Sequence, residues 1–213
     1  MDLIKALAQK SYDRKLLNAV EKEQRMVREM LRIYAPQDLR NVFRELSERR
    51  RALVDPRIPS NEEKAAAWLS SPYEKKPLVE DDAEIYSEKG DRVRSKSEKM
   101  IADKLLLMGI PYKYECPLYL NGFGKVHPDF TLYDAEHDTE IYLEHMGMMD
   151  NPQYAVKAVQ KIEAYEKNGF FPGDRLLLTF ETSGRPMNMR LFEKMIRDRF
   201  AAGSGNFMMF RES

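Results

Sequence analysis

The chain has 213 residues and a mass of 25.0 kDa, enough for one well-packed core and an accessory segment. Hydrophobic residues make up 43% of the chain and charged residues 33%, which excludes an intrinsically disordered protein and favours a soluble globular one. Basic and acidic residues both number 35, so the chain lacks the overall basic excess that marks many nucleic-acid-binding proteins.

The sequence gives no sign of export or membrane insertion. The longest apolar runs, such as residues 104–110, are far too short to span a bilayer. Residues 1–6 lack the apolar region of a signal peptide. The single cysteine, Cys116, allows no internal disulfide and suits a reducing compartment. We therefore expect a cytoplasmic protein without a membrane partner, with Cys116 as a small buried residue.

Helical patterns fill the first third of the chain. Apolar residues at helical spacing predict a helix over residues 3–33, and Pro36 interrupts it. A second helix is predicted over about 38–53, and a short third helix over 62–69. Residues 1–70 are therefore expected to form a helical accessory region. Heptads are not sustained, which argues against a long coiled coil.

This accessory region is locally basic. Residues 1–53 carry 13 Lys and Arg against 8 Asp and Glu. Arg49, Arg50 and Arg51 are either a solvated helix end, where cations are favoured, or a phosphate contact. The helices are accordingly a candidate DNA clamp, an arm that joins copies into a homo-oligomer, or a segment packed against the remainder of the chain.

The sequence pattern changes along the remaining residues. Residues 71–92 contain two prolines and are predicted to be a linker or an irregular wrap. A helix is then predicted to open at Ser95 and to end at Gly109. The elements predicted after it are strands at 112–120, 127–133, 140–144 and 175–180, and helices at 154–167 and 188–200. This order predicts an α/β domain with a mixed sheet over residues 93–213.

Two carboxylates occupy matching places in the predicted hairpin. Asp129 and Glu144 stand at similar distances from the loop at 134–139, so antiparallel pairing would bring them together. Mg²⁺ prefers oxygen ligands in octahedral array and commonly takes one or two protein carboxylates. The pair is therefore a candidate metal site, with Glu98 of the preceding helix as a third carboxylate.

Pro128-Asp129-Phe130, followed by Glu144-His145-Met146-Gly147, resembles the PD-(D/E)xK nuclease superfamily, most closely its bacterial branch with PDF followed by E-H-x-G. The resemblance covers about residues 93–185. The other matching features are Arg94 to Glu98, Tyr114 to Leu118, Tyr154, the pair Lys161-xxx-Tyr165, Asn168-Gly169 and the strand that ends at Glu181. The ordered set, rather than any single motif, carries the resemblance.

The resemblance implies a restriction-endonuclease-like α-β-β-β-α-β core, preceded here by the N-terminal helical segment. It also implies dependence on Mg²⁺ or Mn²⁺, held by Asp129, Glu144 and Glu98, and cleavage of nucleic acid, with DNA as the expected substrate. One position departs from the motif: Met146 replaces a lysine, and a thioether cannot activate water. Lys161, on the next helix, is predicted to supply the missing cation. The alternative is a solvated helix lysine.

Several of these residues also have a purely structural explanation. Ser95 and Glu98 have the spacing of a capping box, so Glu98 is either a helix cap or a metal ligand. Glu115 is either an edge-strand charge or a site residue. His145 is next to a proposed ligand, but adjacent strand residues point to opposite faces, which favours a packing role. Tyr165 favours a core position.

Three functions are compatible with the sequence. The first is a metal-dependent nuclease whose basic N-terminal helices grip the DNA backbone. The second is a catalytically weak or inactive nuclease fold that only binds nucleic acid. The third is an interaction protein whose N-terminal helices join a larger complex. Cleavage of supercoiled plasmid with Mg²⁺ or Mn²⁺ separates the first from the other two.

Overall fold

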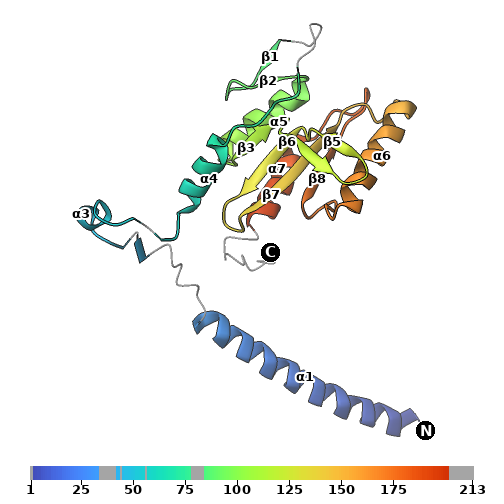
Figure 1. The fold of residues 1–213 in the computed structure, drawn as a ribbon. Coiled ribbons are helices and arrows are strands. Elements are labelled where there is room, and N and C mark those ends of the chain that lie inside the picture. The colour runs from blue at the N-terminus through green and yellow to red at the C-terminus, as the bar shows by residue number, and fades with distance from the viewer. Residues whose placement is uncertain (1, 34–41, 44, 56, 78–83, 202–213) are drawn as a thin grey trace. The chain divides into compact units, whose positions relative to one another are not determined.

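The chain divides into two compact units, residues 1–60 and residues 61–213. None of the described helices is long and apolar enough to cross a membrane. The computed structural model describes residues 2–33, 42–43, 45–55, 57–77 and 84–201 (Figure 1).

The long helix of the first unit, α1, spans Asp2–Ile33 and confirms the helix predicted over 3–33. Its 32 residues give a helix of about 48 Å, at the usual rise of 1.5 Å per residue. All of its side chains from Leu3 to Met30 are exposed, apolar ones included. Apolar residues that produced the helical pattern, such as Leu16, Val20 and Val27, are therefore not buried against other described residues.

The helix predicted over 38–53 is only partly seen. Helix α3 covers Glu48–Arg51, while residues 34–41 and 44 lie outside the described part of the chain. The arginines at 49–51 form the last turn of α3 and are exposed. Their position is that of a solvated helix end, where cations interact favourably with the helix dipole.

A four-stranded mixed sheet is the centre of the second unit. Its strand order is β3-β6-β7-β8, with antiparallel pairing from β3 to β7 and parallel pairing of β7 with β8. The strands are β3 (Tyr112–Tyr114), β6 (Phe130–Asp134), β7 (Thr139–Met146) and β8 (Leu176–Phe180). This confirms the predicted α/β class and the mixed sheet.

The two faces of this sheet pack against different helices. On β7, Ile141 and Leu143 belong to a core shared with α5 (Lys96–Leu107) and α7 (Met189–Ala201). Tyr142, between them, belongs to a second cluster with α6 (Pro152–Lys167). Successive strand residues point to opposite faces, so the apolar run of β7 supplies both cores. The two layers of helices flank the sheet in Figure 1.

The single strand predicted over 112–120 is interrupted. Glu115 has a positive φ of 49°, which breaks the extended backbone, and Pro117 follows it. The second half becomes β4 (Leu118–Leu120), which pairs with β5 (Gly124–Val126) in a separate hairpin. Residues 121–123 form the turn that joins these two strands.

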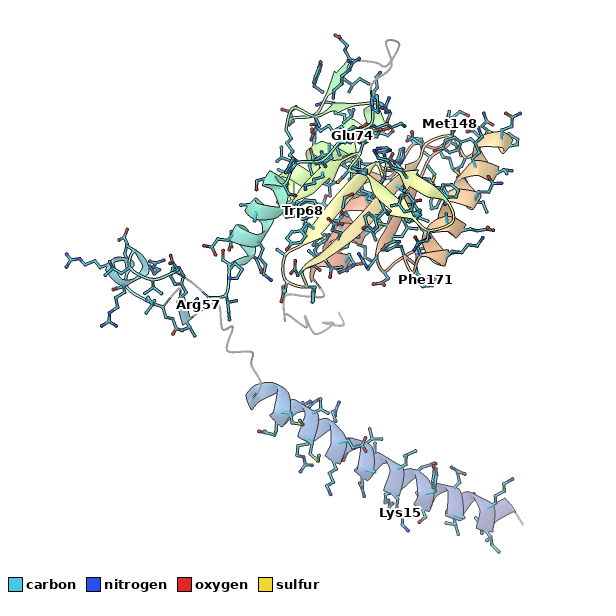
Figure 2. The ribbon with its side chains drawn as sticks, viewed as in Figure 1. Lys15, Arg57, Trp68, Glu74, Met148 and Phe171 are labelled. Atoms are coloured by element: carbon cyan, nitrogen blue, oxygen red, sulfur yellow. The ribbon has the colours of Figure 1, made fainter. Side chains whose placement is uncertain are left out.

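Residues 61–77 and 84–92 belong to the second unit, whereas the sequence predicted a boundary at 70 and a linker over 71–92. Helix α4 (Asn61–Ser70) docks through Trp68, which stacks on Tyr133 with 5.1 Å between ring centroids (Figure 2). Strands β1 (Ile85–Tyr86) and β2 (Arg92–Val93) pair antiparallel within the predicted linker. The predicted boundary differs because sequence periodicity does not reveal a contact across 65 residues of chain.

Candidate functional site

Asp129 and Glu144 meet at one end of the β6–β7 ladder, as their spacing predicted. The ladder runs from Asp134↔Thr139 to Phe130↔Leu143. Asp129 directly precedes Phe130 and Glu144 directly follows Leu143, so both carboxylates lie one residue beyond the last pair. Phe130 and Leu143 face the core of α5 and α7. Their neighbours Asp129 and Glu144 therefore share the opposite face, which α6 covers.

The Asp129 carboxylate is oriented by the backbone of β7. Its Oδ2 accepts the N–H of His145 at 2.7 Å. The β6–β7 ladder stops at Phe130, directly before which Asp129 lies. The N–H of His145 is therefore satisfied by the Asp129 side chain in place of a backbone carbonyl of β6. Burial, then the negative charge of Glu144, raises the pKa of Asp129 well above its ordinary value.

Glu144 is buried and fully engaged. Its side chain is 3% exposed, and Lys161 Nζ lies 2.6 Å from Oε1 and 2.7 Å from Oε2. The hydroxyl of Tyr165 donates to Oε1 at 2.6 Å. A buried carboxylate is costly unless it is paired and hydrogen-bonded, and these two donors meet that need.

One face of α6 supplies these donors. Tyr154, Ala158, Lys161 and Tyr165 follow each other at offsets of four, three and four, which places them on one side of a helix. Tyr165 is fully buried, so its predicted core position is confirmed, and its hydroxyl also serves the site. The hydroxyl of Tyr154 accepts the N–H of Gly147 at 3.3 Å.

Lys161 is a charged member of this site and not a solvated helix lysine. Burial lowers its pKa, but the negative charges of Glu144 and Asp129 raise it by more, so the net pKa lies above its ordinary value. The lysine side chain is 27% exposed, which leaves part of it open to solvent. A positively charged ammonium therefore lies beside the two carboxylates at neutral pH.

Glu98 lies at the N-terminal end of α5 and forms only part of the predicted capping box, because its carboxylate accepts the N–H of Arg94 and not that of the N-cap residue Ser95. The hydroxyl of Ser95 accepts the N–H of Glu98 at 3.1 Å, and Glu98 Oε2 accepts the N–H of Arg94 at 2.8 Å. Tyr114 donates its hydroxyl to the same Oε2 at 2.6 Å. The negative charge of Glu98 is one of the causes, after burial and the charge of Glu144, that raise the pKa of Asp129.

The predicted set of three carboxylate ligands is consequently not assembled. In the part of the chain that the structure describes, no group of three or more His, Cys, Asp or Glu side chains could hold a metal ion. The pair Asp129 and Glu144 nevertheless suits Mg²⁺ or Mn²⁺, since such ions often take one or two protein carboxylates and fill the remaining positions with water and phosphate oxygens. The neighbouring carboxylate that raises the pKa of Asp129 marks a place where a cation would be favoured.

The other residues singled out from the sequence lie around this pair. Glu115 is buried and pairs with Arg94 at 2.8 Å, so it forms a structural ion pair. Met146 is buried at 3% exposure, and no cation replaces it on β7 itself. The ring of His145 lies on the face opposite Glu144, 2.9 Å from Thr179 Oγ1, as the strand alternation predicted.

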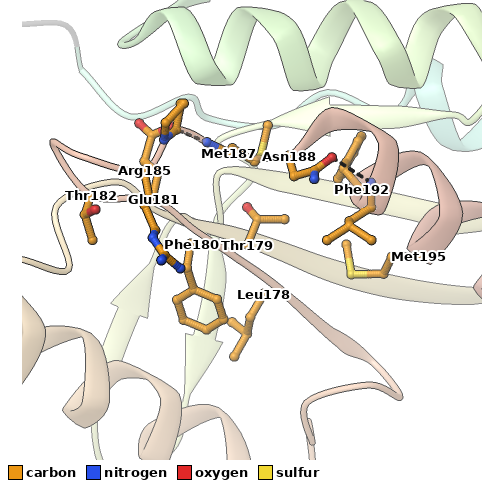
Figure 3. Close-up of a pocket in the computed structure, with 12 residues that line it drawn as sticks. Leu178, Thr179, Phe180, Glu181, Thr182, Arg185, Met187, Asn188, Phe192 and Met195 are labelled. Atoms are coloured by element: carbon orange, nitrogen blue, oxygen red, sulfur yellow. Dashed lines mark hydrogen bonds between the residues drawn. The ribbon is translucent and has the colours of Figure 1, made fainter.

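Glu181, Thr179 and Ser97 form a polar cluster, although the sequence indicated Glu181 only as the end of a matching strand and singled out neither Thr179 nor Ser97 as a site residue. Ser97 donates to both carboxylate oxygens of Glu181 at 2.9 Å. Thr179 and Glu181 also line a mainly apolar pocket of about 430 Å³ at the end of β8, shown in Figure 3. The only sequence signal was a polar residue at each end of an otherwise apolar strand, which is common in any sheet.

The arrangement joins two acidic oxygen donors to a fixed cation at the end of a hairpin. Such a set is suited to a divalent metal ion and to an anionic substrate group. No protein-family model, curated protein or solved structure matches the chain.

Proposed function

We propose that this chain is a divalent-metal-dependent nuclease that hydrolyses phosphodiester bonds in nucleic acid, with DNA as its substrate. The convergence of Asp129, Glu144 and Lys161 carries the proposal. Two carboxylates from adjacent strands supply hard oxygen ligands, and an ammonium from the next helix supplies a positive charge for phosphate.

The architecture of the second unit supports this proposal. Helix α5, strands β3, β6 and β7, helix α6 and strand β8 follow the order α-β-β-β-α-β, with β8 parallel to β7. Apart from the β4–β5 hairpin between β3 and β6, this order agrees with the one that the resemblance to the PD-(D/E)xK superfamily implies, and the agreement supports the proposal. The two carboxylates also lie at the end of the β6–β7 hairpin, where the corresponding motifs fall.

In this proposal Asp129 and Glu144 hold Mg²⁺ or Mn²⁺. Such an ion would supply neutralisation of phosphate charge and a water of lowered pKa. Tyr165 fixes the orientation of Glu144 through its hydroxyl, and the N–H of His145 fixes Asp129. Both carboxylates are therefore pre-oriented, which lowers the cost of assembling the site.

Lys161 replaces the charge that is missing at Met146. Its ammonium is 2.6 Å from Glu144 and stays protonated because the carboxylates raise its pKa. As the water oxygen bonds to phosphorus and the bond to the leaving oxygen breaks, negative charge grows on the phosphate oxygens. A fixed cation beside them stabilises that charge more than the charge of the ground state.

Plasmid cleavage and metal titration test this function together. The wild-type chain is expected to cut supercoiled plasmid with Mg²⁺ or Mn²⁺ and to stop on addition of a chelator. Asp129→Ala and Glu144→Gln are each expected to lose at least about 10²-fold in rate and to bind Mn²⁺ more weakly by calorimetry. Glu136→Ala, which removes an exposed carboxylate from the same hairpin, is the matched control.

Near-wild-type cutting by either site variant would contradict the proposal. Mn²⁺ binding and DNA binding without any cleavage would instead favour the second candidate, a nuclease fold that retains only nucleic-acid binding. The specific observation in favour of that candidate is the buried Met146 at the place of the motif lysine.

A further inference from the structure

Glu181 contacts the C-terminal end of β7 through both its backbone and its side chain. Both oxygens of this carboxylate accept the hydroxyl of Ser97. Its Oε2 also accepts the N–H of Met187 at 3.3 Å (Figure 3). Its Oε1 lies 3.3 Å from Nε2 of His145. Its backbone N–H donates to the carbonyl of Met146 at 2.9 Å, which extends the β7–β8 pairing by one residue.

His145 connects this cluster to the candidate metal site. Its ring is 3% exposed and is held between Thr179 and Glu181 on one face of the sheet. Its backbone N–H leaves the strand at the edge that faces β6 and donates to Asp129 Oδ2 at 2.7 Å. The ring and the peptide belong to one residue, so a restraint on the ring also restrains the donor that orients Asp129.

Glu181 further links β7 to the start of α5. Ser97 lies in the first turn of that helix, directly before Glu98. Burial raises the pKa of Glu181, but the hydrogen bonds from Ser97 and from the backbone of Met187, together with the nearby ring of His145, lower it by more, so the net pKa lies below its ordinary value. A carboxylate that is only 21% exposed loses solvation, and hydrogen-bond donors must compensate for that loss. An apolar residue at this position would not carry the same desolvation cost.

We propose that Glu181 is a positioning residue for Asp129, because it holds the ring of His145 and thereby the N–H that orients the Asp129 carboxylate. This inference rests on the proposed function, in which Asp129 is a metal ligand. Residues that orient metal ligands typically change metal affinity when they are removed, although they do not touch the metal. Loss of Glu181 should therefore free the end of β7 and weaken the pre-orientation of Asp129.

The test uses the full chain and two measurements. Amide hydrogen exchange at His145, followed by NMR without metal, reports the hydrogen bond to Asp129, and calorimetry reports the Mn²⁺ affinity. Glu181→Ala and Ser97→Ala are expected to speed His145 exchange about 10-fold or more and to weaken Mn²⁺ binding roughly 10- to 100-fold. Glu181→Gln keeps an oxygen acceptor and should recover most of both.

The matched control is Glu193→Ala. Glu193 has a similar exposure of 29% and is also hydrogen-bonded, but to Lys104 and Arg197. The control should leave both readouts at wild-type values, and the amide of Ile141 in the core should exchange normally in every variant. A global loss of stability would change Ile141 as well, so its protection distinguishes local from general loosening.

Unchanged exchange at His145 in Glu181→Ala and Ser97→Ala would overturn the inference. If Glu181→Ala does not fold, Ser97→Ala decides alone, because it removes only one hydroxyl. If the wild type binds no Mn²⁺, the proposed function fails, yet the exchange at His145 still decides whether Glu181 holds that peptide.

Discussion

Lys161 places a positive charge beside Glu144, although it lies on α6 and not at the motif position that Met146 occupies. The sequence placed Lys161 and Tyr165 on one helix face and left the lysine as either a site cation or a solvated side chain. In the structure both residues contact Glu144, at 2.6 Å each. The helix periodicity was readable from the sequence, but the distance to β7 was set by the packing of α6 on the sheet.

Lys161→Ala should reduce plasmid cleavage on the order of 10²-fold or more, as expected when a positioned cation is removed from a hydrolytic centre. Lys157→Ala and Lys167→Ala are the controls, since both side chains lie on the same helix and are exposed. The rates are compared at saturating metal, after circular dichroism shows equal helix content. A Lys161 variant no slower than these two would remove the lysine from the mechanism.

Glu98 illustrates the opposite outcome at this scale. Its spacing from Ser95 fitted a capping box as well as a metal ligand, and the sequence alone did not separate these roles. The structure favours the structural role at the helix terminus, because Tyr114 and the backbone N–H of Arg94, the residue before the N-cap, both donate to its Oε2. Tyr114 comes from β3, so the deciding contact depends on how α5 packs against the sheet.

Among the elements, α4 differs most from expectation. The sequence grouped it with the N-terminal helices, but its Trp68 packs on the sheet face of β3 and β6. The indole N–H donates to Glu140 Oε1 at 2.8 Å, and Lys113 Nζ lies 4.5 Å from the ring centroid. These contacts make α4 part of the second unit.

Trp68→Ala should lower the free energy of unfolding of the second unit by about 2–3 kcal/mol, somewhat less than for a fully buried aromatic side chain, because Trp68 is half-buried. Leu69→Ala, which changes the next residue of α4 and an exposed side chain, is expected to cost much less. Urea denaturation compares the two variants. Equal losses would indicate that α4 is not anchored through its tryptophan.

At the scale of the whole molecule, the sheet and the candidate site lie within residues 61–213, and α1 and α3 lie within residues 1–60. The second unit contains its own apolar cores on both faces of the sheet. The first unit carries the local excess of basic residues, including the exposed arginines of α3. The proposed metal site therefore belongs to the second unit, and the basic residues that are candidates for phosphate contact belong to the first.

A chain lacking residues 1–60 should therefore keep the thermal unfolding midpoint of the second unit. If the N-terminal helices grip DNA, the same deletion weakens DNA binding and flattens its salt dependence, by about 0.9 in the log–log slope for each lost phosphate contact. Replacing Arg49, Arg50 and Arg51 by alanine tests the clearest cationic group alone. Binding that is unchanged across a salt titration would favour an oligomer or packing role.

The sequence by itself determined the helix over 3–33, the α/β class, the β6–β7 hairpin and the placement of Asp129 and Glu144 at the same end of that hairpin. These features follow from periodicity and from short distances along the chain, which a sequence displays directly. Tertiary structure alone decided the structural role of Glu98 at the helix terminus, the docking of α4 and the cluster around Glu181. Each of these depends on contacts between elements distant in sequence, and such contacts exist only after the helices have packed on the sheet.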